Sequence, residues 1–292
     1  MKKIMTVLFI FVLMAAFIHP AHTRGQPQRG AGMDFFGDAL VRMERAFDDS
    51  DYTPEDAYYL GRAAAANILA VYEPYREKPE LTHYLNLICI AIAVNSSQPI
   101  LFNGYHVMIL DSHELNAFST PGGHIFITRG LVEVCTSEDM LAAIISHELA
   151  HIMLKHGLGA AEQMEMNMEL AAAADTAAAF AGNTRAARRL MNFRESAAAI
   201  VDTVMINGYS RPQEFEADQK ALSLLADAGY DPAAMLELLH LLQSLERTRG
   251  IGLISTHPSL TDRISNVESM LPFYRTEDTA SLREQRFQAY VN

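Results

Sequence analysis

The clearest candidates for chemistry are two histidines in "SHELAHIMLKHG", residues 146–157. His147 and His151 are four positions apart, so on a helix both point from one face, about 6 Å apart, toward a shared metal ion. Glu148 borders the same face. Imidazole and carboxylate suit zinc, and a glutamate in this pattern can take a proton from an attacking water and pass it to a leaving amine. The pattern therefore predicts a hydrolytic zinc site on a helix.

A catalytic zinc ion needs a further protein ligand, and a second acidic segment can supply it. The segment "QEFEAD" offers Glu214, Glu216 and Asp218 on another predicted helix. Glu214 and Asp218 share a face, so one can bind the ion while the other holds the second nitrogen of a ligand histidine. Spacing alone does not choose between Glu214 and Glu216. The alternative interpretation is an acidic helix face that only contacts solvent.

Two helices are expected to position these residues. Ser137 and the acids after it are typical of a helix start, and Gly157 is expected to end that helix in a left-handed conformation. The acidic helix is predicted to begin near Pro212 and to end at Gly229. Both groups of candidate ligands thus lie on helices rather than on loops.

The elements around these helices indicate the fold class. Helical patterns over 53–72 and 79–94 are followed by a stretch of strand-like composition at 105–128. There "YHVMILDS" and "HIFIT" are rich in β-branched and aromatic residues, with "TPGG" as a turn between them. The stretch 160–206 is rich in Ala and Met and is expected to cover the core. The predicted class is α+β, mainly α, with a small β-sheet beside the active-site helix.

The composition indicates which partners are unfavourable and whether the two cysteines form a disulfide. Half of the 292 residues are hydrophobic, which is enough for a sizeable core. The formal net charge of −12 disfavours contact with phosphate backbones, so no nucleic-acid partner is expected. Cys89 and Cys135 are expected as buried free thiols, with a disulfide as the alternative.

The N-terminus has the pattern of a secretory signal. Lys2 and Lys3 precede an apolar run over 4–18, and small residues allow a cut before Arg24. We therefore predict a signal peptide over 1–23 and a linker over 24–33, with an uncleaved anchor as the alternative. The run is short for a membrane span, and after cleavage no spanning segment is expected. This pattern predicts a protein outside the cytoplasm.

Four segments in one order resemble peptidase family M48, which includes the CAAX prenyl protease, a heat-shock membrane protease and periplasmic outer-membrane quality-control peptidases. The resemblance covers most of residues 50–272. The four segments are "NAFSTPGGHIFITRGLVE", "SEDMLAAIISHELAHIMLKHG", "GYSRPQEFEADQKALSLLADAGYDP" and "STHPSLTDRI". The resemblance implies a gluzincin-type zinc metallopeptidase domain over 34–275 and a C-terminal tail over 276–292.

The resemblance also implies roles for single residues. His147, His151 and Glu214 become the ligands of one zinc ion per chain, with Glu148 as general base and Asp218 as the partner of a ligand histidine. In periplasmic members the histidine of the His-Pro segment can approach the metal and restrain activity. We therefore include His257 among the catalytic residues, and the alternative is a histidine that only enters the last helix.

A substrate mode follows from the strand in "GGHIFIT", which is expected to be an exposed sheet edge. Unpaired backbone groups on such an edge allow an extended peptide to add as a further strand. The expected substrate-binding residues are Asn116, Gly122, Gly123, His124 and Ile125, and the glycines would let the substrate approach closely. The alternative is a hairpin that only packs on the helix.

Together these features predict a periplasmic zinc metalloendopeptidase that cleaves misfolded or stalled envelope proteins. Its expected partners are unfolded or misfolded protein substrates, with the outer-membrane assembly machinery as a further one. The sequence predicts neither the multi-pass membrane helices of the prenyl and heat-shock members nor the tetratricopeptide domain of some periplasmic members. The alternative function is a chaperone-like or assembly factor that uses the same cleft for binding and holds the protease site shut.

Overall fold

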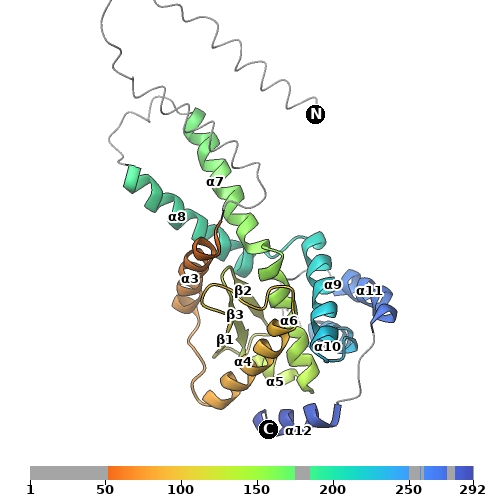
Figure 1. Cartoon of the computed structure of the whole chain (residues 1–292). Coiled ribbons are helices and arrows are strands. Elements are labelled where there is room, and N and C mark those ends of the chain that lie inside the picture. The colour runs from red at the N-terminus through yellow and green to blue at the C-terminus, as the bar shows by residue number, and fades with distance from the viewer. Residues whose placement is uncertain (1–51, 175–184, 250–256, 258–259, 275–279, 292) are drawn as a thin grey trace, which may run out of the picture. The chain divides into compact units, whose positions relative to one another are not determined.

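The computed structural model describes residues 52–174, 185–249, 257, 260–274 and 280–291 (Figure 1). The predicted signal peptide and linker lie outside the described residues. The described elements are α3 (Pro54–Val71), α4 (Pro79–Val94), β1 (His106–Leu110), β2 (Ala117–Thr120), β3 (His124–Thr128), α5 (Arg129–Val134), α6 (Glu138–Met153), α7 (His156–Ala174), α8 (Arg185–Asp202), the π-helical turn η2 (Thr203–Asn207), α9 (Arg211–Asp227), α10 (Ala233–Arg249), α11 (Leu260–Met270), the 3₁₀ turn η3 (Leu271–Phe273) and α12 (Ala280–Tyr290). The predicted class, mainly helical with one small sheet, is confirmed.

The sheet has three strands in the order β1-β3-β2. β3 pairs in parallel with β1, opposing His124 to His106, and antiparallel with β2, opposing Ile127 to Ala117. The expectation that "GGHIFIT" forms an exposed edge is therefore wrong, because β3 is hydrogen-bonded on both sides. The edge beside the turn belongs to β2, a four-residue strand that the composition did not reveal.

Alternating residues of the sheet serve two cores. Val107, Ile125 and Ile127 face the larger core, which also contains residues of α4, α6, α9, α10 and α11. Leu110 and Phe126 face a smaller core formed with α3, α7 and α8. Both faces of the sheet are thus covered, which explains why the strands are nearly continuous in hydrophobic residues.

The motif helix α6 is buried over most of its length, with 14 of its 16 residues inside the protein. The Ser137 hydroxyl accepts a hydrogen bond from the Met140 amide and caps its start as predicted. The end differs from the prediction, because the left-handed residue is Lys155 (φ 59°) and not Gly157. Gly157 lies in the first turn of α7, where an added Cβ would come within 3.2 Å of the Pro121 ring. A side chain at this position would therefore press on the proline ring, and the glycine lets the two segments pack closely.

The acidic helix α9 packs along α6 and has the predicted boundaries. Ser210 and Gln213 form a capping box at its start. At its end Gly229 adopts a left-handed conformation (φ 78°). Contact between these two helices brings the HELAH and QEFEAD segments together.

The region from 156 to 202 contains α7 and α8, which pack against each other, while α8 also packs on α3 (Figure 1). Met164 and Met168 are half-buried and Met166 is 43% exposed. These methionines therefore lie at the margin of the core that they were expected to cover.

Residues 276–292, predicted as a tail, include α12, which packs on α4 and α6. Phe287 is buried, and Tyr290 stacks on Tyr84 with ring centroids 4.6 Å apart. The described part of this segment is thus an element of the larger core.

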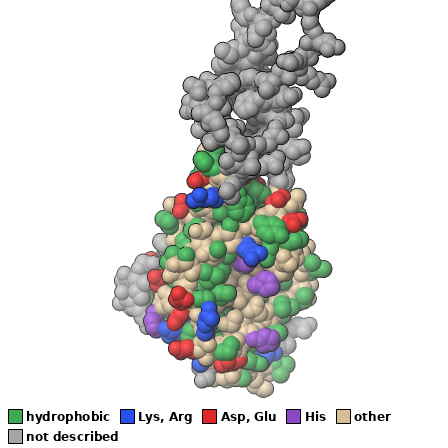
Figure 2. All heavy atoms as spheres, turned by 90° about the vertical axis from the view of Figure 1, so that its left-hand side faces the viewer, with side chains coloured by type: hydrophobic (Ala, Val, Ile, Leu, Met, Phe, Trp, Pro, Cys, Tyr) green, Lys and Arg blue, Asp and Glu red, His purple; other side chains and the backbone are tan. Residues whose placement is uncertain are grey.

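The remaining features are the two cysteines, the hydropathy of the helices and the surface. Cys89 and Cys135 are buried and free. In the described part of the chain no helix is both long and apolar enough to cross a bilayer. Figure 2 shows hydrophobic and charged side chains interspersed on one face of the molecule, and the exposed hydrophobic residues include Val71 and Ile100.

Candidate metal centre and active site

Helix α6 brings the two motif histidines into contact. The Nε2 atoms of His147 and His151 lie 3.0 Å apart, and both side chains are buried. The spacing of four residues on one helix produces this arrangement, because both rings project from the same face. Two ring nitrogens that face each other this closely need a proton or a cation between them.

Helix α9 adds the carboxylate of Glu214, which is fully buried. Its oxygens lie 3.5 Å from the Nε2 atoms of His147 and His151. The spacing in the sequence left Glu214 and Glu216 as alternatives, and the structure brings only Glu214 to the histidine pair. Glu216, two residues further along, is turned by about 200° around the helix axis, and its side chain is exposed.

His257 approaches the same point from a third segment. Its Nδ1 lies 2.8 Å from Glu214 Oε1 and 3.3 Å from His147 Nε2. The side chain is buried although it comes from a position 110 residues after His147 in the chain. His257 therefore faces the cluster and does not merely precede a helix.

The four groups together fit a zinc ion. One candidate ligand atom from each of His147, His151, Glu214 and His257 lies within 4.8 Å of the others, and all four residues are buried. Zinc binds nitrogen and oxygen ligands at about 2.1 Å in tetrahedral geometry, which separates the ligands from one another by about 3.4 Å. The observed separations of 2.8–3.5 Å are of this size.

Glu148 lies beside the cluster without joining it. Its Oε1 is 3.5 Å from His257 Nε2, and its Oε2 has no hydrogen-bond partner among the described residues. The side chain is 2% exposed. A buried carboxylate oxygen that lacks a donor is costly, and an incoming water or substrate N–H would supply one.

Asp218 and Arg263 contact the candidate ligands from outside the cluster. Asp218 Oδ1 lies 3.1 Å from His147 Nδ1, so Asp218 holds the ring nitrogen that faces away from the cluster. Arg263 on α11 donates two hydrogen bonds to Asp218, at 2.7 and 2.8 Å, and its Nη1 lies 2.9 Å from Glu214 Oε2. Sequence reasoning missed Arg263, and its only signal was a basic residue six positions after His257.

Electrostatics in the cluster favour positive charge at one ring and neutrality at the other. Burial and the Arg263 charge lower the pKa of His147, but Asp218 and Glu214 outweigh them and raise it to about 9. Burial and the neighbouring His147 hold the pKa of His151 well below its usual value. Burial also raises the pKa of Glu214, but His257 and Arg263 lower it well below its usual value. The carboxylates thus favour a cation among the imidazoles, and a neutral imidazole such as His151 is the form that binds metals.

His151 has a second set of neighbours. Its Nδ1 lies 2.8 Å from Nδ1 of His156, the first residue of α7. The Nε2 of His156 in turn lies 3.3 Å from Glu216 Oε2. The ring of Tyr209 stacks on His151, with centroids 4.0 Å apart. Sequence reasoning did not single out His156 or Tyr209.

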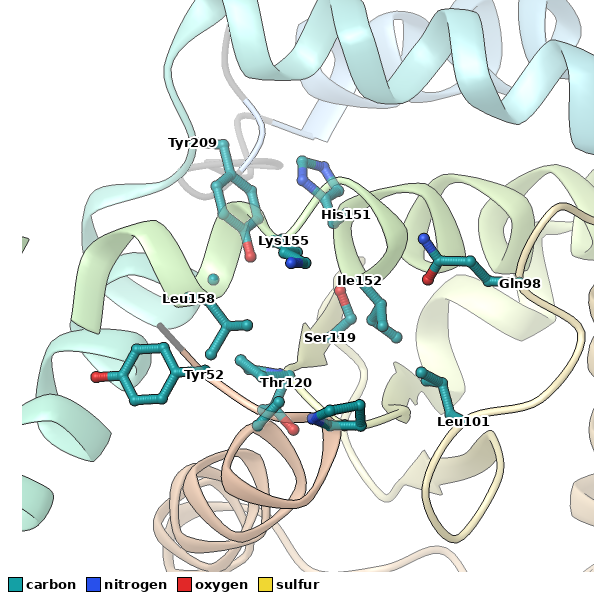
Figure 3. A pocket seen from close by; sticks show the side chains of 15 residues that line it. Tyr52, Gln98, Leu101, Ser119, Thr120, His151, Ile152, Lys155, Leu158 and Tyr209 are labelled. Atoms are coloured by element: carbon teal, nitrogen blue, oxygen red, sulfur yellow. The ribbon is translucent and has the colours of Figure 1, made fainter. Parts of the chain in front are cut away.

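A pocket opens beside His151, between β2 and the junction of α6 and α7 (Figure 3). Ser119 and Thr120 of β2 line it together with Ile152, Leu158 and Tyr209, as Figure 3 shows. The hydroxyls of Ser119 and Thr120 are buried and have no hydrogen-bond partner among the described residues. The pocket thus combines apolar walls with unused polar groups on the edge strand.

The predicted substrate residues lie mostly elsewhere. Gly122 lines the pocket, but Asn116, Gly123, His124 and Ile125 are not among its described lining residues. The Asn116 side chain accepts a hydrogen bond from the Ala117 amide, His124 stacks on Tyr58, and Ile125 is fully buried.

The two glycines are explained by the protein's own backbone. An added Cβ at Gly122 would lie 2.4 Å from Tyr58 Cα, and one at Gly123 would lie 2.3 Å from the Gly104 carbonyl oxygen. Both glycines also have positive φ, of 77° and 102°. The close approach that the sequence suggested for a substrate is therefore made by α3 and by the loop before β1.

A helix-borne His-Glu-x-x-His pair and a glutamate from a second helix form a candidate metal site beside a small sheet, the arrangement expected of a metallopeptidase. The sequence profile described as Peptidase family M48 matches residues 80–271. The chain belongs to this family, and the family resemblance noted in the sequence is confirmed.

Three curated relatives illustrate the range of the family. The chain is 32% identical over 160 residues to the mitochondrial metalloendopeptidase OMA1 of Schizosaccharomyces pombe, covering 54% of this chain and 44% of that protein. It is 31% identical over 205 residues to a putative beta-barrel assembly-enhancing protease of Vibrio cholerae, covering 66% and 40%. It is 26% identical over 197 residues to the metalloprotease LoiP of Escherichia coli, covering 66% and 71%. The chain spans half or less of the length of the first curated relatives it matches.

Proposed function

We propose that this protein is a zinc-dependent endopeptidase that cleaves misfolded or stalled proteins of the cell envelope. The observation that carries the proposal is the convergence of His147, His151, Glu214 and His257, whose candidate ligand atoms lie within 4.8 Å of one another. Membership in a peptidase family supports peptide-bond hydrolysis as the reaction.

In this proposal His147, His151 and Glu214 hold one zinc ion, and Asp218 and Arg263 orient them. A bound zinc ion would act as a Lewis acid that lowers the pKa of water and polarises the peptide carbonyl. Glu148 accepts the proton of the attacking water and returns it to the amine nitrogen of the leaving peptide. Its unpaired, buried Oε2 supports this role, because a proton donor is needed there.

Substrate would bind as an extended strand along β2. Ser119 and Thr120 border the pocket beside His151, and β2 has no backbone partner other than β3 in the described part of the chain. Pairing through the backbone depends little on side-chain identity, which suits an enzyme for unfolded chains. The apolar pocket walls favour a hydrophobic side chain next to the cleaved bond.

We place the protein in the periplasm, exported by residues 1–23. Two basic residues and an apolar run support export, and the name of the Vibrio relative refers to beta-barrel assembly. We infer that the outer-membrane assembly machinery is a partner. Cell fractionation and N-terminal sequencing of the full chain test this. A mature N-terminus at Arg24 in the periplasmic fraction is expected, and an unprocessed cytoplasmic protein would contradict it.

The catalytic proposal is tested with Glu148→Gln in the purified protein. Turnover of casein should fall on the order of a hundredfold or more because a positioned general base is lost. Zinc content should stay at one per chain, because no ligand is removed. The control is Glu237→Gln, an exposed glutamate of α10, which should leave turnover unchanged. Near-normal turnover by Glu148→Gln would exclude this mechanism.

One observation favours a second function, a restrained binding or assembly factor. His257 Nδ1 is as near to Glu214 and His147 as zinc ligands are to each other, and a fourth protein ligand would fill the position that water needs. In that case His257→Ala should raise casein cleavage several-fold, whereas exposed His83→Ala should not. If His257 instead donates a hydrogen bond to the oxyanion of the reaction intermediate, His257→Ala should lower turnover with zinc retained. A fall of this kind would argue against the restrained form.

A further inference from the structure

The ligand candidates His147 and His151 are supported in different ways. His147 Nδ1 meets the carboxylate of Asp218 directly, at 3.1 Å. His151 Nδ1 contacts another imidazole instead of a carboxylate, namely Nδ1 of His156, at 2.8 Å. His156 is buried, and its other ring nitrogen lies 3.3 Å from Glu216, whose side chain is 62% exposed. The carboxylate on the His151 side is therefore one residue further away.

The proton positions in this chain follow from the metal-binding role of His151. A ligand that binds through Nε2 keeps its proton on Nδ1. His151 Nδ1 must then donate to His156 Nδ1, which accepts. The proton of a neutral His156 is left on Nε2, where it faces the Glu216 carboxylate. Both hydrogen bonds can therefore form only if His151 donates to His156 and His156 donates to Glu216.

We propose that His156 is a positioning residue for His151, and that Glu216 holds His156 in the accepting tautomer. The inference rests on the proposed zinc site, and it assigns a role to Glu216 that its exposed place on α9 does not suggest. Tyr209 stacks on one face of the His151 ring, so rotation of that ring is limited by packing while its tautomer is set by His156.

The arrangement also ties α7 to the metal centre. His156 is the first residue of α7, and it follows directly on Lys155, the left-handed residue that separates α7 from α6. A shift of the start of α7 would therefore change the acceptor of a zinc ligand. His147, in contrast, depends on α9 and α11 through Asp218 and Arg263.

The test compares His156→Asn, His156→Gln and His156→Ala. The side-chain oxygen of asparagine can take the place of Nδ1 and still accept from His151, whereas glutamine places its amide near the position of Nε2 and contacts Glu216 instead. The readout is the zinc dissociation constant, measured by competition with a chromophoric chelator. His156→Ala and His156→Gln should weaken zinc binding about tenfold, the usual effect of losing a hydrogen-bond partner of a ligand, and His156→Asn should retain most of the affinity.

A role in packing alone predicts another order. His156→Asn and His156→Ala would then bind zinc equally well and differ from wild type only in melting temperature. That result would overturn the proposal. Histidine ¹⁵N shifts provide a second check, because zinc-loaded wild type should show His151 protonated on Nδ1, and protonation of His156 on Nδ1 would contradict it.

Surface variants keep the test informative if the His156 variants fail to fold. Glu216→Gln should weaken zinc binding by less than tenfold but measurably, because the amide oxygen still accepts while the charge is lost. Asp227→Asn removes a charge from an exposed position of the same helix and should leave affinity unchanged. Equal affinities for these two variants would count against the inference. A wild type that binds no zinc would instead refute the proposed function itself.

Discussion

The two ends of α6 each hold a buried glutamate among polar partners, and the two clusters differ in how their hydrogen bonds are satisfied. At the start of the helix, Glu138 accepts hydrogen bonds from Tyr84 at 2.7 Å, from Tyr230 at 3.2 Å and from Arg286 at 2.5 and 2.9 Å. Every partner there is a donor and the carboxylate accepts from all of them. The helix N-terminus adds further positive potential.

At the other end of α6, groups of the same kind converge on one point. The nitrogens of His147 and His151 face each other at 3.0 Å, and Glu148 Oε2 lacks a hydrogen-bond partner among the described residues. A complete network stabilises structure, whereas an incomplete one leaves polar atoms that a ligand can satisfy. The contrast fits the proposed metal centre, and it predicts which variants affect folding and which affect binding.

The largest expected effect is at Glu214. Glu214→Gln should weaken zinc binding by more than the about 10–100-fold that loss of an outer partner costs, because a ligand itself is lost. In chelator competition Glu216→Gln should stay within tenfold of wild type. The melting temperature of wild type should fall on adding EDTA, and that shift should vanish in Glu214→Gln. Similar losses from both variants would break the distinction between the two glutamates.

At the opposite end, Glu138→Ala should lower the free energy of unfolding by about 2–3 kcal/mol, because the buried tyrosine hydroxyls lose their acceptor. Zinc affinity should not change. Urea denaturation of the metal-free protein provides the measurement. The control is Glu80→Ala, an exposed first-turn glutamate of α4, which should cost well under about 1 kcal/mol. Loss of zinc in Glu138→Ala would show that the two ends are not independent.

Asp218→Asn should have an intermediate effect on the metal end. Its amide oxygen can still accept one hydrogen bond, but the charge that supports His147 and pairs with Arg263 is gone. Zinc affinity or casein turnover should fall about 10–100-fold. Asp227→Asn, on the same helix, serves as the matched control. Values equal to that control would mean that Asp218 does not act through His147.

Much of the fold follows from local signals in the sequence. Ser137 and Gly229 mark helix ends by side-chain capping and by a left-handed conformation, and these depend only on neighbouring residues. The arrangement of the sheet does not. β3 lies between β1 and β2 because β1, whose residues stand 18 positions earlier in the chain, pairs with it in parallel. Nothing in "HIFIT" itself distinguishes a central strand from an edge strand.

The same division holds for the site. The spacing of His147 and His151 indicates a metal pair because one helix fixes their geometry. Arg263 and His156 could not be predicted in this way, because each acts through contact between separate helices. The choice of Glu214 over Glu216 came from resemblance to a family, and its geometric reason is the face of α9 that packs on α6.

The candidate zinc ligands come from separate places in the chain, and His257 follows His147 by 110 positions. Only the folded chain brings all four together, so a zinc ion at this site would bind the native state more tightly than the unfolded chain. Metal supply would then set the folded population by mass action, adding about 2.7 kcal/mol of stability when free zinc is about 100 times its Kd. Zinc scarcity would then lower the stability of the folded protein as well as remove the ion that the proposed chemistry needs.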